Sequence, residues 1–369
     1  MEGGRLLGSG TYGCAFSPPL LCEGSFKKDF KKVGKITSEP LARQEIIIGN
    51  RIRRVPLASH YFLLPEPESC TPAPEESQTE PGIQQCRDEF ERHGEDLEID
   101  SMKQIIEPFG GIKPFYVLFD NKSLHPKHFN FFHFMRHILE AGSTLLLAGV
   151  CHFDLHPGNL LVDNRKIVRI LDFGLSFPTN TINDIVVNGR WKRLRFGGEA
   201  DAAHPQVVNS EAPELTIMNA IRRREYSLPD AVKQTVLGKP VFKDIQTYLG
   251  ISKETSRDDL VEFFETSKAA RDRNFVAVWK TYWPGFDSWA LGCILLETLK
   301  ALVLLPEFAQ GPYKTKKPLV LATLRGMLEP NPRDRLDCIE ALSLYDPGSP
   351  WIARFGQKWL AARKQQRKQ

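Results

Sequence analysis

The stretch His152–Val162 reads HFDLHPGNLLV, and it decides the fold. It places Asp154 five residues before Asn159, and a second acidic motif, DFG, begins at Asp172. Phosphoryl transfer requires a carboxylate that orients the attacking hydroxyl and accepts its proton, together with an oxygen ligand for Mg²⁺. We therefore assign the first role to Asp154 and the second to Asn159.

Two short β-branched runs lie between these motifs, at Leu160–Val162 and Ile167–Leu171. The intervening letters DNRK favour a turn, so the two runs predict a β-hairpin. Such a hairpin would return Asp172 beside the first acidic motif, where its carboxylate would bridge Mg²⁺ to the phosphates of ATP. The two motifs in this order and at this spacing are improbable by chance.

A glycine-rich segment lies near the start of the sequence. Residues Leu6–Phe16 read LLGSGTYGCAF, with Gly8, Gly10 and Gly13 in G-x-G-x-x-G spacing. Glycines let backbone N–H groups approach phosphate oxygens closely. A dinucleotide-binding turn has the same letters, but it requires a helix directly after the glycines. The sequence Ser-Pro-Pro, which begins at Ser17, disfavours a helix directly after the glycines, so a strand–turn–strand flap is the better prediction.

Lys35 ends an extended segment after the glycine loop, where its ammonium can reach phosphate oxygens as a point charge. The letters SEP from Ser38 indicate a helix start with Pro in the first turn. In that helix Glu45 shares a face with apolar residues, and a carboxylate on such a face needs a partner. We expect Lys35 to be that partner; a solvated Glu45 is the alternative.

The chain resembles a eukaryotic-type protein kinase, and the match runs in order over most of its length. APE at Ala212–Glu214 resembles the end of the activation segment. FDSWALGCILLETL resembles the helix whose aspartate, here Asp287, braces the catalytic loop. MLEPNPRDRL resembles the motif whose arginine, here Arg335, pairs with Glu214. The resemblance implies a two-lobed α+β fold, with a small β-rich N-lobe holding one main helix and a larger, mainly helical C-lobe.

The same resemblance implies a nucleotide site. It makes IIEPFGG, from Ile105, the hinge between the lobes, so that adenine would bond to the Glu107 carbonyl and the Phe109 N–H. Ala15 occupies the position where a valine usually packs on the adenine, so the side of the pocket formed by this residue would be less bulky. The glycine loop and Lys35 would hold the phosphates.

The resemblance also implies ATP and Mg²⁺ as cofactors. It implies a protein substrate whose Ser or Thr hydroxyl receives the γ-phosphate, since Pro157 is typical of the serine/threonine class. Two further residues depart from the family pattern: Phe153 replaces the arginine before the catalytic aspartate, and His156 replaces the lysine that contacts the transferring phosphate. We expect His156 to act in that place beside Asp154.

Two other functions stay open. DLHPGN is typical of aminoglycoside and related small-molecule phosphotransferases, which makes such an enzyme the second candidate. A pseudokinase that binds partners without turnover is the third. It is disfavoured because the sequence retains all of the catalytic positions, namely Lys35, Asp154, Asn159 and Asp172.

The expected domains are an N-lobe over residues 1–107, a C-lobe over residues 108–357 and a frayed basic tail over residues 358–369. A Pro- and Glu-rich stretch at about residues 65–95 is expected to be a disordered insertion, because its composition cannot bury a core. The span from Glu214 to Asp287 is longer than is usual in kinases, which indicates a second insertion at about residues 215–282.

Composition sets further limits on function. The 369 residues are 41% hydrophobic and 25% charged, as in globular proteins, and the net charge of +4 is too small to indicate a nucleic-acid partner. No apolar run has membrane-spanning length, and the first residues show no signal peptide. The seven cysteines form no CxxC pair, so we expect neither a zinc site nor a disulfide framework.

The scattered cysteines favour a reducing, intracellular compartment, either cytoplasm or nucleus. More narrowly, the segments GSGTYGCAFSPPLLC and YW-x-x-FDSWALG resemble kinases of large DNA viruses, which would place the protein in a host cell or a virion. The sequence does not specify an oligomeric state.

Overall fold

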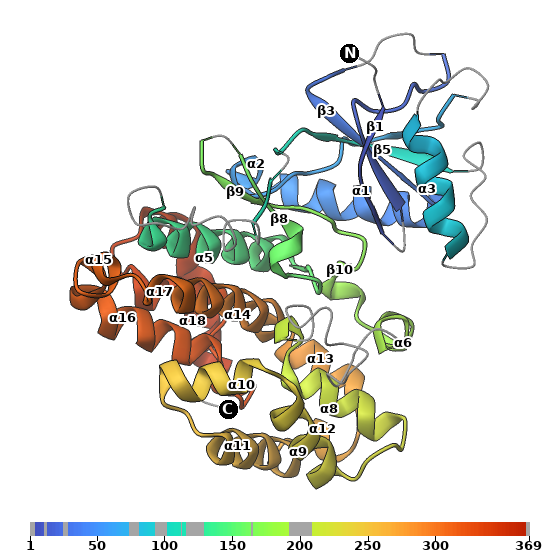
Figure 1. Ribbon diagram of the computed structural model, residues 1–369. Helices are drawn as coiled ribbons and strands as arrows, with labels where there is room; N and C mark the ends of the chain where they lie inside the picture. Colours follow the sequence, from blue (N-terminus) through green and yellow to red (C-terminus); the bar gives the residue numbers. More distant parts are fainter. Residues whose placement is uncertain are drawn as a thin grey trace. The chain divides into compact units, whose positions relative to one another are not determined.

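The computed structural model divides the chain into two compact units. The N-terminal unit consists of Met1–Lys113 and Leu160–Ser176, and the C-terminal unit consists of Pro114–Asn159 and Phe177–Gln369. The described residues are 4–10, 13–24, 29–73, 81–92, 102–111, 113–115, 129–163, 165–191 and 209–366. A β-sheet dominates the first unit and helices dominate the second, which confirms the predicted α+β, two-lobed fold (Figure 1).

A five-stranded sheet in the order β1-β2-β3-β5-β4 forms the centre of the N-terminal unit. All neighbouring strands are antiparallel. Their bounds are β1 Arg5–Gly10, β2 Gly13–Ser17, β3 Lys32–Thr37, β4 Ser69–Cys70 and β5 Lys103–Pro108. The register places Lys35 between Ala15 on β2 and Ile105 on β5, and it places Glu107 opposite Val33.

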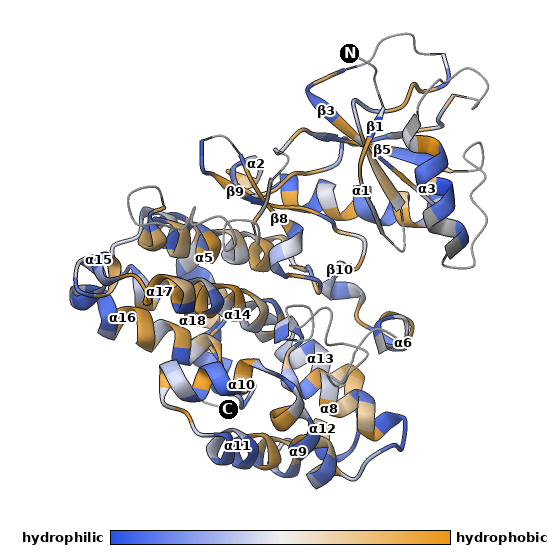
Figure 2. Ribbon diagram, in the orientation of Figure 1, coloured by the Kyte–Doolittle hydropathy of each residue, from blue (hydrophilic) through white to orange (hydrophobic). Residues whose placement is uncertain are grey.

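Helix α1 (Glu39–Arg53) follows β3 and carries Pro in its first turn, as the letters SEP predict. Its buried residues include Glu45, Ile48 and Ile52, which confirms the predicted face. Helix α1 carries both hydrophilic and hydrophobic residues, as expected for a helix with one buried side (Figure 2).

The predicted hairpin is confirmed in the same unit. Strands β8 (Leu160–Val162) and β9 (Val168–Ile170) are antiparallel, with Leu160 opposite Ile170. Strand β6 (Lys113–Pro114) lies on the other side of β8, and helix α2 (Ala58–Tyr61) contacts β9.

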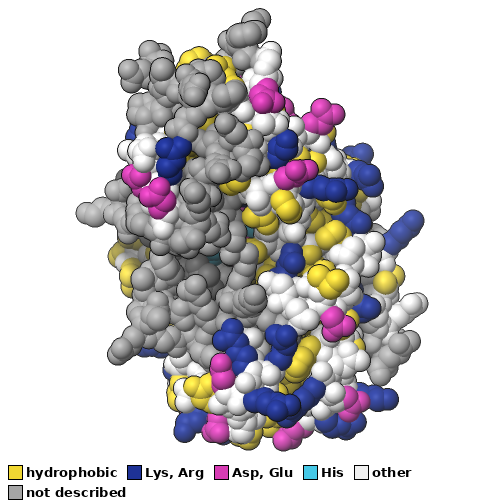
Figure 3. Space-filling model, turned by 90° about the vertical axis from the view of Figure 1, so that its right-hand side faces the viewer, with side chains coloured by type: hydrophobic (Ala, Val, Ile, Leu, Met, Phe, Trp, Pro, Cys, Tyr) yellow, Lys and Arg dark blue, Asp and Glu magenta, His cyan; other side chains and the backbone are white. Residues whose placement is uncertain are grey.

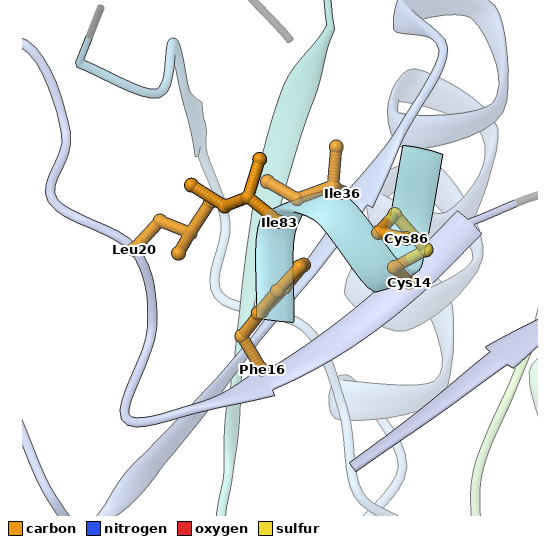
Figure 4. Close-up of a cluster of buried hydrophobic side chains, with 6 residues drawn as sticks. All are labelled: Cys14, Phe16, Leu20, Ile36, Ile83 and Cys86. Atoms are coloured by element: carbon orange, nitrogen blue, oxygen red, sulfur yellow. A yellow bond between two sulfur atoms is a disulfide. The ribbon is translucent and has the colours of Figure 1, made fainter. Parts of the chain in front are cut away.

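The predicted disorder at about residues 65–95 is wrong for the described parts of that stretch. Helix α3 (Pro81–Arg92) lies against β1, and it buries Ile83 and Cys86 in an apolar cluster (Figures 1 and 4). The other buried members of the cluster are Cys14, Phe16, Leu20 and Ile36. Residues 74–80 and 93–101 of the predicted insertion lie outside the described residues.

The prediction of no disulfide framework is also wrong. Cys14 bonds to Cys86, and Cys22 bonds to Cys70 (Figure 4 shows the first pair). The partners are 72 and 48 residues apart, so only the folded sheet brings them together. The expectation of a reducing compartment rested on unpaired cysteines and therefore loses that support.

The disulfide between Cys14 and Cys86 should stabilise the N-terminal unit, because it restricts the unfolded chain. Replacing both cysteines by Ser should lower the free energy of unfolding by roughly 2–5 kcal/mol, measured by urea denaturation. Alkylation of the denatured, unreduced protein should label three of the seven cysteines, the free ones being Cys151, Cys293 and Cys338. Labelling of all seven without a reductant would contradict the pairing.

The C-terminal unit is built mainly of helices. Helix α5 begins after Asn130, whose side chain accepts from the His133 N–H, and it ends at Gly149 in the left-handed conformation. Its neighbours α14 and α17 pack against it and form the core. The larger helices are α5 Phe131–Ala148, α6 Asp184–Trp191, α8 Pro213–Arg222, α14 Pro284–Leu302, α16 Pro312–Met327, α17 Cys338–Tyr345 and α18 Gln357–Gln366. The short elements are β7 Val150–Cys151, η3 Pro157–Asn159, β10 Phe177–Pro178, η4 Thr179–Thr181, α15 Pro306–Ala309 and η7 Ile352–Gly356.

The segment expected as a second insertion folds into helices that follow α8. They are α9 Leu228–Gly238, α10 Val241–Asp244, η6 Ile245–Leu249, α11 Lys253–Thr266, α12 Lys268–Arg271 and α13 Phe275–Tyr282. Helices α9 and α11 pack together, and both bury apolar side chains. This segment is therefore part of the packed unit.

The expected frayed tail is wrong as far as Gln366. Helix α18 covers most of it, and two side chains attach the helix to Asp337. The Trp359 indole N–H donates to that carboxylate at 2.8 Å, and Arg363 Nε lies 2.9 Å from it. Because Asp337 also caps the start of α17, the end of the described chain is held to the core.

No helix in the described parts of the chain has both the length and the apolar character that crossing a bilayer requires. Lys and Arg side chains are interspersed with Asp and Glu on the face shown in Figure 3, in keeping with the small net charge.

Candidate active site

The glycine-rich segment forms the hairpin of β1 and β2. Gly8 lies opposite Ala15, and Gly10 lies opposite Gly13; residues 11–12 are outside the described residues. A Cβ at Gly13 would collide with the carbonyl oxygen of Ile36 on β3, so β2 requires glycine there. A strand follows the glycines, which excludes the dinucleotide-binding turn.

Lys35 is the centre of a charged cluster in the N-terminal unit. Its Nζ lies 2.7 Å from Glu45 Oε1 and 2.8 Å from Asp172 Oδ1. Burial opposes the charge on Lys35, but the carboxylates of Asp172 and Glu45 outweigh it and raise the pKa of Lys35 above its ordinary value. The predicted pairing of Lys35 with Glu45 is therefore present, although only ten residues separate the two.

The segment after β9 is held in place by residues that sequence reasoning missed. Asp172 has a φ of 64°, a strained conformation for a residue other than glycine. Gln44 Nε2 donates to the Gly174 and Ser176 carbonyls at 3.0 and 2.9 Å, and the Phe173 ring packs against Phe62. Gln44 directly precedes Glu45 on α1, and nothing in its local sequence distinguishes it from a surface residue.

The expected adenine contacts fall on β5 and on the residue after it. The Phe109 N–H donates to the Lys31 carbonyl at 2.9 Å, so in this structure a backbone partner already occupies the group that was expected to bind adenine. Glu107 was expected to contribute only its carbonyl, yet its side chain is buried beside the charged cluster. Burial raises the pKa of Glu107 to about 8; Glu45 and Asp172 act in the same direction, and Lys35 opposes them.

The predicted catalytic loop lies in the C-terminal unit. Asn159 Nδ2 donates to the Asp154 carbonyl at 2.8 Å and to Asp154 Oδ2 at 3.2 Å. His156 Nδ1 accepts from the Gly158 N–H at 3.1 Å, and its Nε2 lies 3.9 Å from Asp154 Oδ1. A neutral His156 with Nδ1 as acceptor carries its proton on Nε2, on the side of Asp154. The structure thus brings three predicted residues together.

Asp287 braces this loop from α14, as the resemblance implied. Its carboxylate accepts from the His152 N–H at 2.7 Å and from the Phe153 N–H at 2.9 Å. Burial raises the pKa of Asp287 to about 6, and these two backbone N–H groups oppose the shift. They hold Phe153 in a left-handed conformation with a φ of 67°, directly before Asp154.

Glu214 and Arg335 form the ion pair that the resemblance implied. The two distances are 2.7 and 2.9 Å, and both side chains are fully buried. Arg335 also donates to the Glu329 and Pro330 carbonyls, and it lies over the Trp289 ring. The pair fixes the start of α8, where the activation segment ends.

Comparisons with known proteins find sequence matches over parts of the chain. Residues 124–206 match the APH family, described as the phosphotransferase enzyme family. Mitogen-activated protein kinase 12 of Danio rerio is 28% identical over 211 residues, 56% of this chain and 46% of that protein. Serine/threonine-protein kinase PDK1 of Cryptococcus neoformans is 31% identical over 115 residues, 31% of this chain and 9% of that protein.

The chain is thus similar in sequence to a phosphotransferase family and to protein kinases. The matched segments span less than half the length of these curated relatives.

Two oxygen donors of this kinase-like chain fit Mg²⁺, a hard cation that prefers such ligands. In the C-terminal unit, the amide nitrogen of Asn159 donates to Asp154, so the amide oxygen is the atom that could accept a metal. In the N-terminal unit, the side chain of Asp172 is 41% exposed, so its carboxylate is open to a metal as well as to Lys35.

We expect phosphotransfer activity without phosphorylation of the activation segment. In kinases an arginine before the catalytic aspartate pairs with a phosphorylated residue there. Phe153 cannot form a charge-assisted bond; instead its ring packs against Phe177 and Trp279, with centroids 5.6 and 5.1 Å away. Phosphatase treatment should leave the transfer rate unchanged. A large loss of rate that returns on rephosphorylation would contradict this prediction; the sites to monitor are Ser176, Thr179, Thr181 and Ser210.

Proposed function

We propose that the protein is an ATP-dependent protein kinase that transfers the γ-phosphate to Ser or Thr hydroxyls of protein substrates. The observation that carries the proposal is the cluster of Lys35, Glu45 and Asp172, since this charge arrangement suits the phosphates and metal of a nucleotide. The intact pair of Asp154 and Asn159 supports turnover and argues against a pseudokinase.

In the proposed reaction, Asp154 orients the acceptor hydroxyl and takes its proton as the hydroxyl oxygen bonds to the γ-phosphorus. The bond from that phosphorus to the β-phosphate oxygen breaks, and ADP leaves. Asn159 and Asp172 would hold Mg²⁺, which neutralises phosphate charge when bound. Lys35 would bind phosphate oxygens, and the Nε2–H of His156 would contact the transferring group.

Two features of the C-terminal unit support a polypeptide acceptor. The buried pair of Glu214 and Arg335 anchors the activation segment, which an extended peptide needs as a platform. The same unit contains a pocket of about 240 Å³. Its lining includes Pro157 of the catalytic loop, Asn209 and Ser210 before α8, Asp244 of α10 and Glu297 of α14.

A small-molecule phosphotransferase is the second candidate, because the APH family match covers the DLHPGN loop. Transfer from γ-labelled ATP to a panel of proteins and peptides, and in parallel to aminoglycosides and choline, separates the two. We expect labelled protein that yields phosphoserine or phosphothreonine. Phosphotyrosine alone would refute the acceptor class, and rapid labelling of a small molecule with no protein acceptor would favour the second candidate. The narrower viral likeness stays a prediction.

A further inference from the structure

The side chain of Glu107 is an unexplained polar group in the N-terminal unit. It is 8% exposed, and its Oε1 has no hydrogen-bond partner among the residues that the structure describes. Leaving a buried polar atom unpaired costs free energy, so such an atom calls for a partner. Neither the catalytic residues nor the resemblance assigns this side chain a role.

The sheet register shows where this carboxyl points. Residues directly opposite on neighbouring strands share a face, and so do alternate residues on one strand. Lys35 lies opposite Ile105, and Glu107 follows Ile105 by two positions, so Glu107 and Lys35 share a face. Ala15, opposite Lys35 on β2, lies on that face as well. This is the face that bears the residues expected to hold the nucleotide.

The charges around Glu107 favour its neutral form. Burial and the carboxylates of Glu45 on α1 and Asp172 after β9 raise the pKa of Glu107 to about 8, against the opposing effect of Lys35 on β3. A neutral carboxyl presents one O–H donor beside one C=O acceptor, whereas an ionised carboxylate only accepts. The two forms therefore suit different partners.

Nucleobase edges match these two forms differently. Adenine presents an amino donor beside a ring-nitrogen acceptor, which complements a neutral carboxyl. The ring N–H and amino group of guanine are two neighbouring donors, which complement a carboxylate. The Phe109 N–H, expected to bind adenine, is bonded to Lys31, so the base needs another polar contact.

We propose that the Glu107 side chain is the base-reading group of the nucleotide site, its protonated carboxyl pairing with the amino group and a ring nitrogen of adenine. The proposal rests on the proposed function for the nucleotide itself, but not on the identity of the acceptor. It makes Glu107 a specificity-determining residue.

Calorimetric binding of three Mg²⁺-nucleotides to the intact protein tests the proposal. They are ATP, GTP and purine riboside triphosphate, which lacks the 6-amino group. At about pH 6.5, ATP should bind roughly tenfold more tightly than the purine analogue, the effect of one buried hydrogen bond. At about pH 9.5 the carboxylate still accepts from the 6-amino group, so this ratio should stay above one, whereas GTP should gain relative to ATP because its two donors suit a carboxylate. Ratios between nucleotides cancel pH effects on their shared phosphates.

Two variants identify Glu107 as the source of the effect. Glu107→Gln keeps a donor and an acceptor at every pH, so its preference for ATP over GTP should be the same at about pH 6.5 and about pH 9.5. Glu107→Met removes both the donor and the acceptor, so it should abolish the preference for ATP over the purine analogue at either pH. Thermal melting confirms that the variant folds. A preference of ATP over the purine analogue that survives Glu107→Met, a wild-type ATP-to-GTP ratio that does not change with pH, or a failure to bind any nucleotide would overturn the proposal. Base-selective binding without transfer to any protein would instead refute the proposed acceptor and leave the role of Glu107 standing.

Discussion

Asp154→Asn should lower kcat by roughly 10²–10⁴-fold, the usual effect of removing a positioned base. The Asn side chain has nearly the same shape, and its oxygen can still accept from Asn159, so the loop should keep its structure. ATP binding should change little, because no phosphate or metal contact is assigned to Asp154. Single-turnover transfer and direct nucleotide binding, measured on the same preparation, separate the two effects.

Asp172→Asn provides the matched control for this experiment. It should also lose turnover, but Mg²⁺-dependent ATP binding should fall with it, because Asp172 is the proposed metal ligand and a partner of Lys35. Near-normal transfer by Asp154→Asn would remove Asp154 from its catalytic role. Equal loss of nucleotide binding in both variants would show that Asp154 also acts on the nucleotide.

Arg335→Ala should lower the free energy of unfolding of the C-terminal unit by roughly 3–5 kcal/mol, because it leaves the Glu214 carboxylate buried without its partner. Glu214→Ala should lower the free energy of unfolding by a similar amount, since it leaves the Arg335 guanidinium buried beside Trp289 without its carboxylate partner. Adding the second substitution should cost much less than the first, so the two effects should be strongly non-additive. Urea denaturation of the four proteins gives this cycle directly.

The ion pair of Arg136 with Asp346 is the matched surface control. Its atoms are 3.1 Å apart, but the Arg136 side chain is 49% exposed. Water and salt screen such a pair, so Arg136→Ala should cost about 0–1 kcal/mol. If Arg335→Ala cost no more than Arg136→Ala, the buried pair would not be what anchors α8.

The local chemistry of the site could be predicted from the sequence. The Asp154–Asn159 spacing, the hairpin of β8 and β9 and the helix that carries Glu45 depend on residues close together along the chain. Turn residues, hydrophobic periodicity and helix caps depend only on residues a few positions apart, so they can be recognised in a single sequence. The pairing of Glu214 with Arg335 is distant in sequence, and only the family resemblance supplied it.

Tertiary structure decided the rest. The disulfide partners, the order of α3 and the attachment of Arg363 to Asp337 depend on contacts between residues far apart along the chain. Composition wrongly predicted disorder around α3. The burial of Ile83 and Cys86 and the disulfide of Cys86 with Cys14 hold this polar segment against the sheet. Likewise, the sequence does not distinguish Glu107 from an exposed charged residue. The register of β3 and β5 places its carboxyl on the same face as Lys35. Strand register and side-chain burial depend on the whole sheet, whereas a sequence pattern reports only on residues that are close together along the chain.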